Sequence, residues 1–175
     1  MELKQKGQET FIPLIQLMAT MKWTTAADFD LAALYETTEG KIGLVYFGDR
    51  GDKNAFPYIN LNEDSGVGDK GGNNEEVLFI TRLDGMKYVW IFCWDYNRTQ
   101  KGETARFADS DVQIIIESNS GTNVAVKLDS VESGNITCVA SIDNSSAEGA
   151  KLINTSKVAT LNGLKTLEQL VEIVR

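Results

Sequence analysis

The strongest constraint on the fold is an alternation of apolar and polar residues that recurs along most of the chain. In the segment 15–23 the odd positions are apolar, and the odd positions from Phe29 to Tyr35 repeat the pattern. Alternation with a period of two predicts β-strands that face a core on one side. Further strands are expected at residues 41–47, 76–83, 88–96, 112–117, 123–128, 136–142 and 150–159.

The segment 88–96 differs from the others because it is apolar on both faces, with aromatic residues at every second position. A strand of this kind is expected at the centre of a sheet that is covered on both sides. We interpret its aromatic side chains as core packing rather than as a ligand platform. Short strands separated by turns rich in Gly, Asn, Asp and Ser indicate a sandwich or a barrel. We therefore predict a mainly β fold, an antiparallel β-sandwich.

The C-terminal segment has a helical period instead. Apolar residues recur there at steps of three and four, at Leu164, Leu167, Leu170, Val171 and Val174. Asn162 or Thr166 is expected to cap this helix. A second, weaker helical turn is expected near residues 104–108. The chain has 175 residues without an internal repeat, so we predict a single domain spanning residues 1–175.

Composition narrows the classes of partner. The net charge of −8 disfavours binding to nucleic acid and to anionic membranes, although many soluble proteins are acidic simply because charge keeps them dispersed. No apolar run reaches the roughly 18 residues of a membrane-spanning helix. The first residues also lack the apolar core of a signal peptide, so we expect a cytoplasmic protein.

The absence of histidine removes several kinds of chemistry. Ser-His-Asp and Cys-His catalysis and histidine-based metal sites are excluded, and a cysteine-only zinc site would need four thiols where the chain has two. Cys93 and Cys138 lie in apolar runs and are expected to be buried packing thiols. A reducing compartment also disfavours a disulfide between them.

Two segments are rich in oxygen donors. Asp28 and Asp30 stand two residues apart on an expected strand and therefore point the same way. The loop 62–76 is dense in Asp, Glu, Asn and Gly. Calcium binds about six to eight oxygen ligands of these types, and glycine lets a loop fold around an ion. From the residues alone, a metal site and a plain solvated turn are equal alternatives.

Known loop motifs do not decide between these alternatives. Asp64 and Glu75 occupy the first and twelfth positions of an EF-hand loop. The third and fifth positions are glycines, however, and Asp69 occupies the sixth position, where that loop requires glycine. The loop also lacks the Gly-Lys-Ser/Thr of a phosphate-binding P-loop.

The order of several motifs resembles the TerD family of tellurium-resistance and stress-response proteins over nearly the whole chain. The matching positions are Trp23, Asp28-Phe29-Asp30-Leu31, Val45-Tyr46-Phe47, Asp64, the glycine-acid element 68–75 and Gly163-Leu164-Lys165. The resemblance implies a β-sandwich in which two loops share bound Ca²⁺. Carried over position by position, it implies the ligands Asp28, Asp30, Asp64, Asp69 and Glu75. Asn73 and Asn74 stand where the family has acids and would offer neutral oxygens.

Departures from the family pattern predict weaker binding, or one site in place of two. Ala32 replaces the third aspartate of the strand motif, Gly71 replaces another acid, and Lys70 adds a positive charge beside Asp69. Calcium affinity follows ligand charge, so each change lowers it. Asp95, which faces away from Trp94 on its strand, is expected to be a buried hydrogen-bonded carboxylate rather than an additional ligand.

These observations lead to three functional hypotheses. The first is a Ca²⁺-dependent binding or scaffold module, not an enzyme, that acts in a stress response with an unidentified protein partner. The second is a TerD-like interaction module that has lost its metal and holds Asp69 with Lys70 instead. The third and most distant is a hydrolase that uses paired carboxylates.

Overall fold

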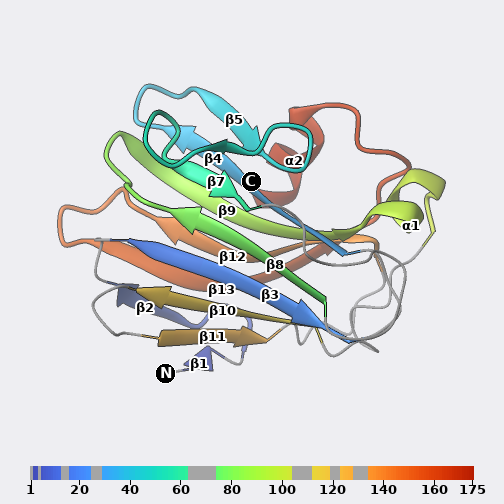
Figure 1. Ribbon diagram of the computed structural model, residues 1–175, viewed down its shortest axis with the longest axis horizontal. Coiled ribbons are helices and arrows are strands. Elements are labelled where there is room, and N and C mark those ends of the chain that lie inside the picture. Colours follow the sequence, from blue (N-terminus) through green and yellow to red (C-terminus); the bar gives the residue numbers. More distant parts are fainter. Residues whose placement is uncertain are drawn as a thin grey trace.

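Two packed β-sheets form the molecule in the computed structural model, which describes residues 2–3, 5–12, 16–24, 29–62, 74–103, 112–118, 123–127 and 134–175 (Figure 1). The seven-stranded sheet has the order β1 (Glu2–Leu3), β11 (Asn123–Lys127), β10 (Gln113–Ser118), β3 (Leu17–Trp23), β8 (Asn74–Ile80), β7 (Ile59–Leu61) and β6 (Gly51–Asp52). The six-stranded sheet has the order β2 (Glu9–Ile12), β13 (Ala150–Ala159), β12 (Ile136–Asp143), β9 (Met86–Asp95), β4 (Phe29–Thr37) and β5 (Ile42–Val45).

Neighbouring strands pair antiparallel, apart from the two-residue strand β1, which runs parallel to β11. The predicted antiparallel β-sandwich is therefore confirmed. Strands β1, β2, β6 and β7 were not predicted, because segments of two to four residues are too short to show a period.

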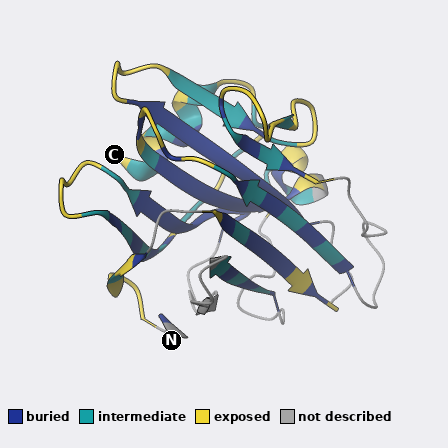
Figure 2. Ribbon diagram, turned by 60° about the vertical axis from the view of Figure 1, so that its left-hand side comes forward, coloured by how far each residue is buried: buried dark blue, intermediate teal, exposed yellow. Residues whose placement is uncertain are grey.

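The main core lies between the two sheets and follows the predicted alternation. The odd residues of β3 from Leu17 to Trp23 are buried, as are Leu78 and Ile80 of β8, which lie beside Ala19 and Leu17 on the same face of the sheet. Removing each such side chain from water stabilises the fold by about 1.5–3 kcal/mol. The dark central strands in Figure 2 show how continuous this burial is.

Strands β4 and β9 are neighbours inside the six-stranded sheet and are buried on both faces. One face of each strand belongs to the main core, and the other packs against helix α2 (Leu167–Val174). The second face carries Trp90, Phe92 and Trp94, so the aromatic residues of β9 are core residues as predicted. The sequence predicted only one buried face for β4, but all nine of its residues are buried, because α2 supplies a second cover.

Helix α2 begins where the sequence analysis placed it. Thr166 is the N-cap residue, and the side-chain oxygen of Gln169 accepts a hydrogen bond from the Thr166 amide at 3.0 Å. At the far end, Arg175 forms an ion pair with Glu36, a buried carboxylate of β4. This pair fastens the end of the chain to the centre of the six-stranded sheet.

Helix α1 (Tyr96–Lys101) was not predicted, and its first residue was assigned to the preceding strand. The Oδ1 atom of Asp95 accepts a hydrogen bond from the Arg98 amide at 3.1 Å and so caps the helix. Gly102, at φ 70°, ends it in the left-handed conformation. The weak helical turn expected near residues 104–108 lies outside the described residues.

Truncating the α2 side chain at the centre of the second cluster should destabilise the fold. Leu170 is fully buried there, so Leu170→Ala should lower the free energy of unfolding by about 2–5 kcal/mol in a denaturant titration. The control Glu172→Ala changes an exposed residue of the same helix and should stay within about 0.5 kcal/mol of wild type. Equal stability of both variants would contradict the packing role of α2.

Candidate metal centre

The predicted site residues that the structure describes lie at one end of the sandwich. In the seven-stranded sheet β3 ends beside the start of β8, where Trp23 pairs with Asn74. In the six-stranded sheet β4 begins beside the end of β9, where Phe29 pairs with Asp95. The rings of Trp23 and Phe29 meet edge to face across the core at 5.7 Å, which places the two pairs of strand ends opposite one another.

Asp30 is the second residue of β4 and is 9% exposed. Its neighbours Phe29 and Leu31 face the main core, so Asp30 points to the other side of the sheet, toward the face that carries Ala32. Asp30 stands beside Trp94 in the strand register. A carboxylate is thus held close to apolar side chains at a strand start, where charge is costly without a compensating partner.

The start of β8 turns two polar side chains inward. Asn74 and Glu76 are 4% and 3% exposed, and they share the face of Leu78 and Ile80. The Oε2 atom of Glu76 accepts a hydrogen bond from the Leu31 amide of β4 at 2.6 Å. One carboxylate therefore links the two sheets directly at this end of the molecule.

Glu75 points the opposite way. It alternates with Asn74 and Glu76 along the strand, lies on the outer face, and its Oε2 atom is 3.6 Å from the Lys22 ammonium. The sequence analysis named Glu75 and passed over Glu76. The alternation of Glu76 with Leu78 and Ile80 was the signal that could have identified it, since residues two apart on a strand share a face.

Asp95 closes the end of β9 and is 3% exposed. Besides capping α1, its Oδ2 atom lies 3.6 Å from the Arg98 guanidinium. The Asp95 amide donates a hydrogen bond to the Asn135 carbonyl at 3.2 Å, and the Thr99 hydroxyl donates to the same oxygen at 3.1 Å. The prediction of a buried, hydrogen-bonded carboxylate at Asp95 is confirmed.

The pKa values of the two buried thiols depend on burial and on the charges near them. Burial raises the pKa of the Cys93 thiol well above its usual range, and the negative charges of Glu76, Asp30 and Asp95 raise that pKa further. Three carboxylates from three strands thus act on one buried point. Burial also raises the pKa of Cys138 to about 12. Both thiols stay protonated at neutral pH, and their predicted role as buried packing residues is confirmed.

Four of the candidate ligands, Asp28, Asp64, Asp69 and Asn73, lie outside the described residues. Within the described ranges no group of three or more His, Cys, Asp or Glu side chains is arranged to hold a metal ion. The donors that the structure does describe are the oxygen atoms of Asp30 and Asn74 at the strand starts, with Glu76 and Asp95 beside them. Oxygen donors of this kind fit a hard cation such as Ca²⁺ rather than a soft metal.

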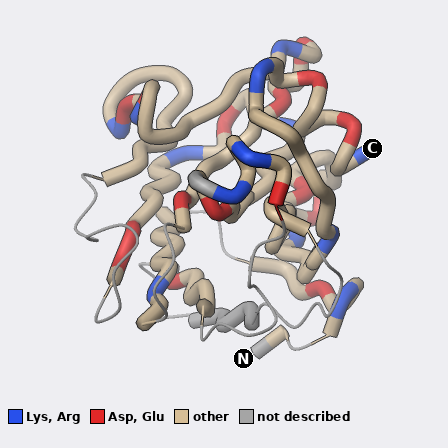
Figure 3. The backbone as a smooth tube through the Cα atoms, turned by 90° about the vertical axis from the view of Figure 1, so that its right-hand side faces the viewer, with Lys and Arg blue, Asp and Glu red and all other residues tan. Residues whose placement is uncertain are grey.

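Charge elsewhere in the described part of the molecule is mixed. In Figure 3, which views the molecule from the side of α1, acidic and basic positions are interspersed along the backbone. We also find that no helix within the described segments is long and apolar enough to cross a membrane.

No protein-family model matches the sequence, and no curated protein matches it. Solved structures do match. The crystal structure of a protein of unknown function has a TM-score of 0.64 and 17% identity, covering 87% of this chain and 92% of its own. The crystal structure of a homologue of the telluride resistance protein TerD, from Streptomyces coelicolor, has a TM-score of 0.52 and 16% identity, covering 88% of this chain and 92% of its own.

The chain has a TerD-like fold. At these identities the likeness concerns the fold, and it confirms the predicted sandwich with its C-terminal helix. Within this TerD-like fold, the position of Ala32 is fully buried in the cluster beneath α2. Ala32, where the resemblance implied an acid, therefore contributes packing and no side-chain oxygen.

The two carboxylates at the start of β8 should differ in their effect on stability. Glu76→Met keeps the size of the side chain but leaves the buried Leu31 amide without its acceptor, which should cost about 1–3 kcal/mol of unfolding free energy. Glu75→Met removes a largely exposed ion pair and should cost less than about 1 kcal/mol. Urea titrations of both variants make the comparison, and a larger loss for Glu75→Met would overturn the assignment of the inward face to Glu76.

The thiols should be unreactive in the folded protein. Burial raises the pKa of both thiols, and nearby carboxylates raise that of Cys93 further, so a disulfide reagent such as dithionitrobenzoate should not label native protein at pH 8. Two thiols should be labelled after addition of denaturant. Rapid labelling of native protein would show that the region around Cys93 is open to water.

Proposed function

We propose that this protein is a Ca²⁺-dependent binding or scaffold module with a TerD-like fold, acting in a stress response and not as an enzyme. The observation that carries the proposal is the presence of buried carboxylates on three strand ends at one end of the sandwich. Asp30, Glu76 and Asp95 come from three strands, and the negative charge of each raises the pKa of the Cys93 thiol. Buried carboxylates are costly unless they are compensated, and a bound cation is one way to compensate them.

Asp30 and Asn74 are the described residues that would hold the ion. The expected ligands Asp28, Asp64, Asp69 and Asn73 would complete the oxygen set. Bound Ca²⁺ would supply positive charge, replacing repulsion between carboxylates with attraction. Because Asp30 is the second residue of β4 and Asn74 is the first residue of β8, an ion shared between them would tie the two sheets together at this end. A partner that recognises the surface formed by this end would then bind in a Ca²⁺-dependent way.

A specific observation favours the second hypothesis, a metal-independent interaction module. Protein groups already engage three of the acids at the strand ends: Glu75 pairs with Lys22, Glu76 accepts the Leu31 amide, and Asp95 accepts the Arg98 amide. These contacts already compensate part of the negative charge that a cation would otherwise neutralise. The replaced acids at Ala32 and Gly71 and the positive charge of Lys70 act in the same direction. If calcium binds, these features support a site weaker than the family norm, or a single site. A role in tellurium resistance is suggested by the TerD-like fold alone.

Thermal unfolding in excess EDTA and in millimolar Ca²⁺ tests the proposal. A ligand at one hundred times its Kd that binds only the folded state adds about 2.7 kcal/mol of stability. For a chain of this size that corresponds to a rise in Tm of about 5–10 °C. Superimposable curves in the two solutions would reject the calcium proposal and favour the metal-independent module.

Removing one described ligand should reduce that response. Asp30→Asn keeps the size of the side chain but removes its charge, so the rise in Tm on adding Ca²⁺ should fall by more than half, as measured by differential scanning calorimetry. The matched control, Glu148→Gln, removes an exposed charge in the turn between β12 and β13 and should respond as wild type does. An unaltered response of Asp30→Asn would remove Asp30 from the proposed ligand set.

A further inference from the structure

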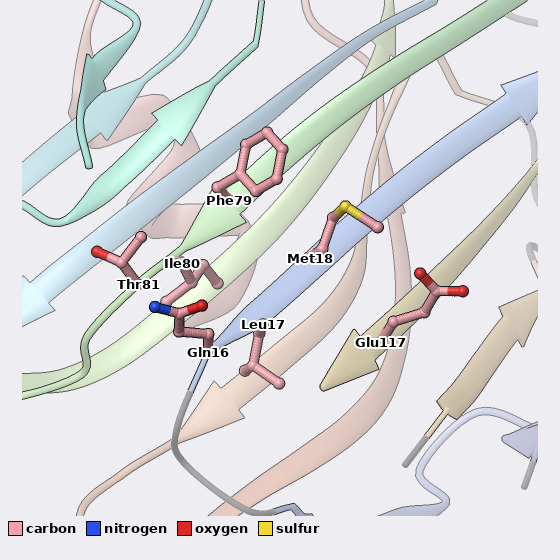
Figure 4. Close-up of a pocket in the computed structure, with 7 residues that line it drawn as sticks. All are labelled: Gln16, Leu17, Met18, Phe79, Ile80, Thr81 and Glu117. Carbon is pink, nitrogen blue, oxygen red and sulfur yellow. The ribbon is translucent and has the colours of Figure 1, made fainter. Parts of the chain in front are cut away.

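The outer face of the seven-stranded sheet carries a hollow of about 290 Å³ that the proposed calcium site does not use (Figure 4). It lies where β3 begins and where β8 and β10 end, since Leu17 pairs with both Ile80 and Ser118. The candidate metal centre is at the other end of β3 and β8, six residues away along each strand, or about 20 Å. The two features are therefore separate.

The floor and walls of the hollow come from one row of the sheet. Met18 of β3 pairs with Phe79 of β8 on one side and with Glu117 of β10 on the other. All three point outward and are partly exposed, while Leu17 and Ile80 form the buried layer beneath. Gln16 and Thr81 line the end of the hollow (Figure 4).

The apolar surface extends beyond the hollow along the same face. The next row of the sheet places Thr20 beside Val77 and Ile115, and the last two are partly exposed. Helix α2 covers the other sheet, and the described helices contact strands of that sheet. Within the described residues, this apolar stripe has no helical cover of its own.

Charge at the rim shows what chemistry fits the hollow. The carboxylate of Glu117 stands at one side, and within the described part of the chain it has neither an ion pair nor a hydrogen bond. On the other side, the ammonium of Lys53 covers the ring of Phe79 at 3.9 Å from its centroid. A ligand that fills the apolar floor thus meets a negative charge on the β10 side, in a protein whose net charge is −8.

We propose that this hollow binds an extended peptide segment in which an apolar side chain is followed or preceded by Lys or Arg. The apolar side chain would pack on Met18 and on the part of Phe79 that Lys53 leaves uncovered, and the basic side chain would pair with the carboxylate of Glu117 on the β10 side, away from Lys53. The overall negative charge attracts such a segment from a distance. The hollow is open to one side of the sheet, which suits a peptide lying across strands better than an enclosed small molecule.

A displayed library of random seven-residue peptides, panned against the intact protein in EDTA, tests the proposal independently of calcium. Panning should enrich sequences with a Leu, Met or Phe next to Lys or Arg. The most enriched peptide, made synthetically with a fluorescent label, should bind wild type with an affinity that fluorescence polarisation can measure.

Three variants locate the binding. Glu117→Gln should lower the affinity for the labelled peptide about fivefold, the size expected for the loss of a partly exposed ion pair. Met18→Gln keeps the length of the side chain but makes the floor of the hollow polar, and it should lower the affinity for the peptide about tenfold. Glu172→Gln removes a charge from α2, over the other sheet, and should leave the affinity unchanged.

The outcomes separate cleanly. Enrichment of basic-apolar sequences whose affinity falls in Glu117→Gln and Met18→Gln, but not in Glu172→Gln, supports the proposal. No enrichment, enrichment of acidic or wholly apolar sequences, or equal binding to all variants would overturn it. Because EDTA is present throughout, failure here leaves the calcium proposal unaffected, and failure of the calcium proposal leaves this one unaffected.

Discussion

Burial of β4 and β9 on both faces is the constraint on which the rest of the structure depends. These strands share one face with the opposing sheet and the other with α2, so a charged residue inside them has no access to water except at the strand ends. The acidic residues of the two strands lie at or near the strand ends. Asp30 stands at the start of β4 and Asp95 at the end of β9, while Glu36, near the end of β4, is met by Arg175.

The candidate metal centre follows from this arrangement. Antiparallel pairing brings the start of β4 to the end of β9, and sheet packing brings the start of β8 opposite both. Carboxylates from three strands are therefore buried at this end of the molecule, with Glu76 between the sheets and Asp30 on the opposite face of β4. Their repulsion is reduced in part by the Leu31 amide and the Arg98 side chain. A divalent cation bound here, as we propose, would reduce that repulsion further, and it would act on the same strand ends that hold the two sheets together.

The two ends of β3 and β8 thus differ in character. At one end, oxygen donors and buried charge favour a hard cation. At the other end, Met18 and Phe79 form an apolar floor with Glu117 at its rim, which favours a peptide with a basic residue. A scaffold module needs more than one contact surface, and a rigid sheet keeps two such surfaces at a constant separation of about 20 Å.

Much of the fold could be predicted from the sequence because its signals are local. The alternation in residues 15–23 corresponds to β3, the two-faced apolar run to the central strand β9, and the period near Leu170 to helix α2. Helix α1 was not predicted because Asp95, its N-cap residue, is also the last residue of strand β9. Its capping role depends on the hydrogen bond that its side chain accepts from the Arg98 amide, and the sequence does not show that bond.

By itself, the sequence determined the class of fold, the absence of histidine chemistry and the oxygen-rich nature of the candidate site. Only the tertiary structure decided which groups the inward-facing acids contact. Glu76 rather than Glu75 reaches the Leu31 amide, and Ala32 lies in an apolar cluster. The physical reason is that periodicity fixes which residues share a face of one strand, whereas contacts between sheets depend on register and packing, which involve residues far apart in the chain.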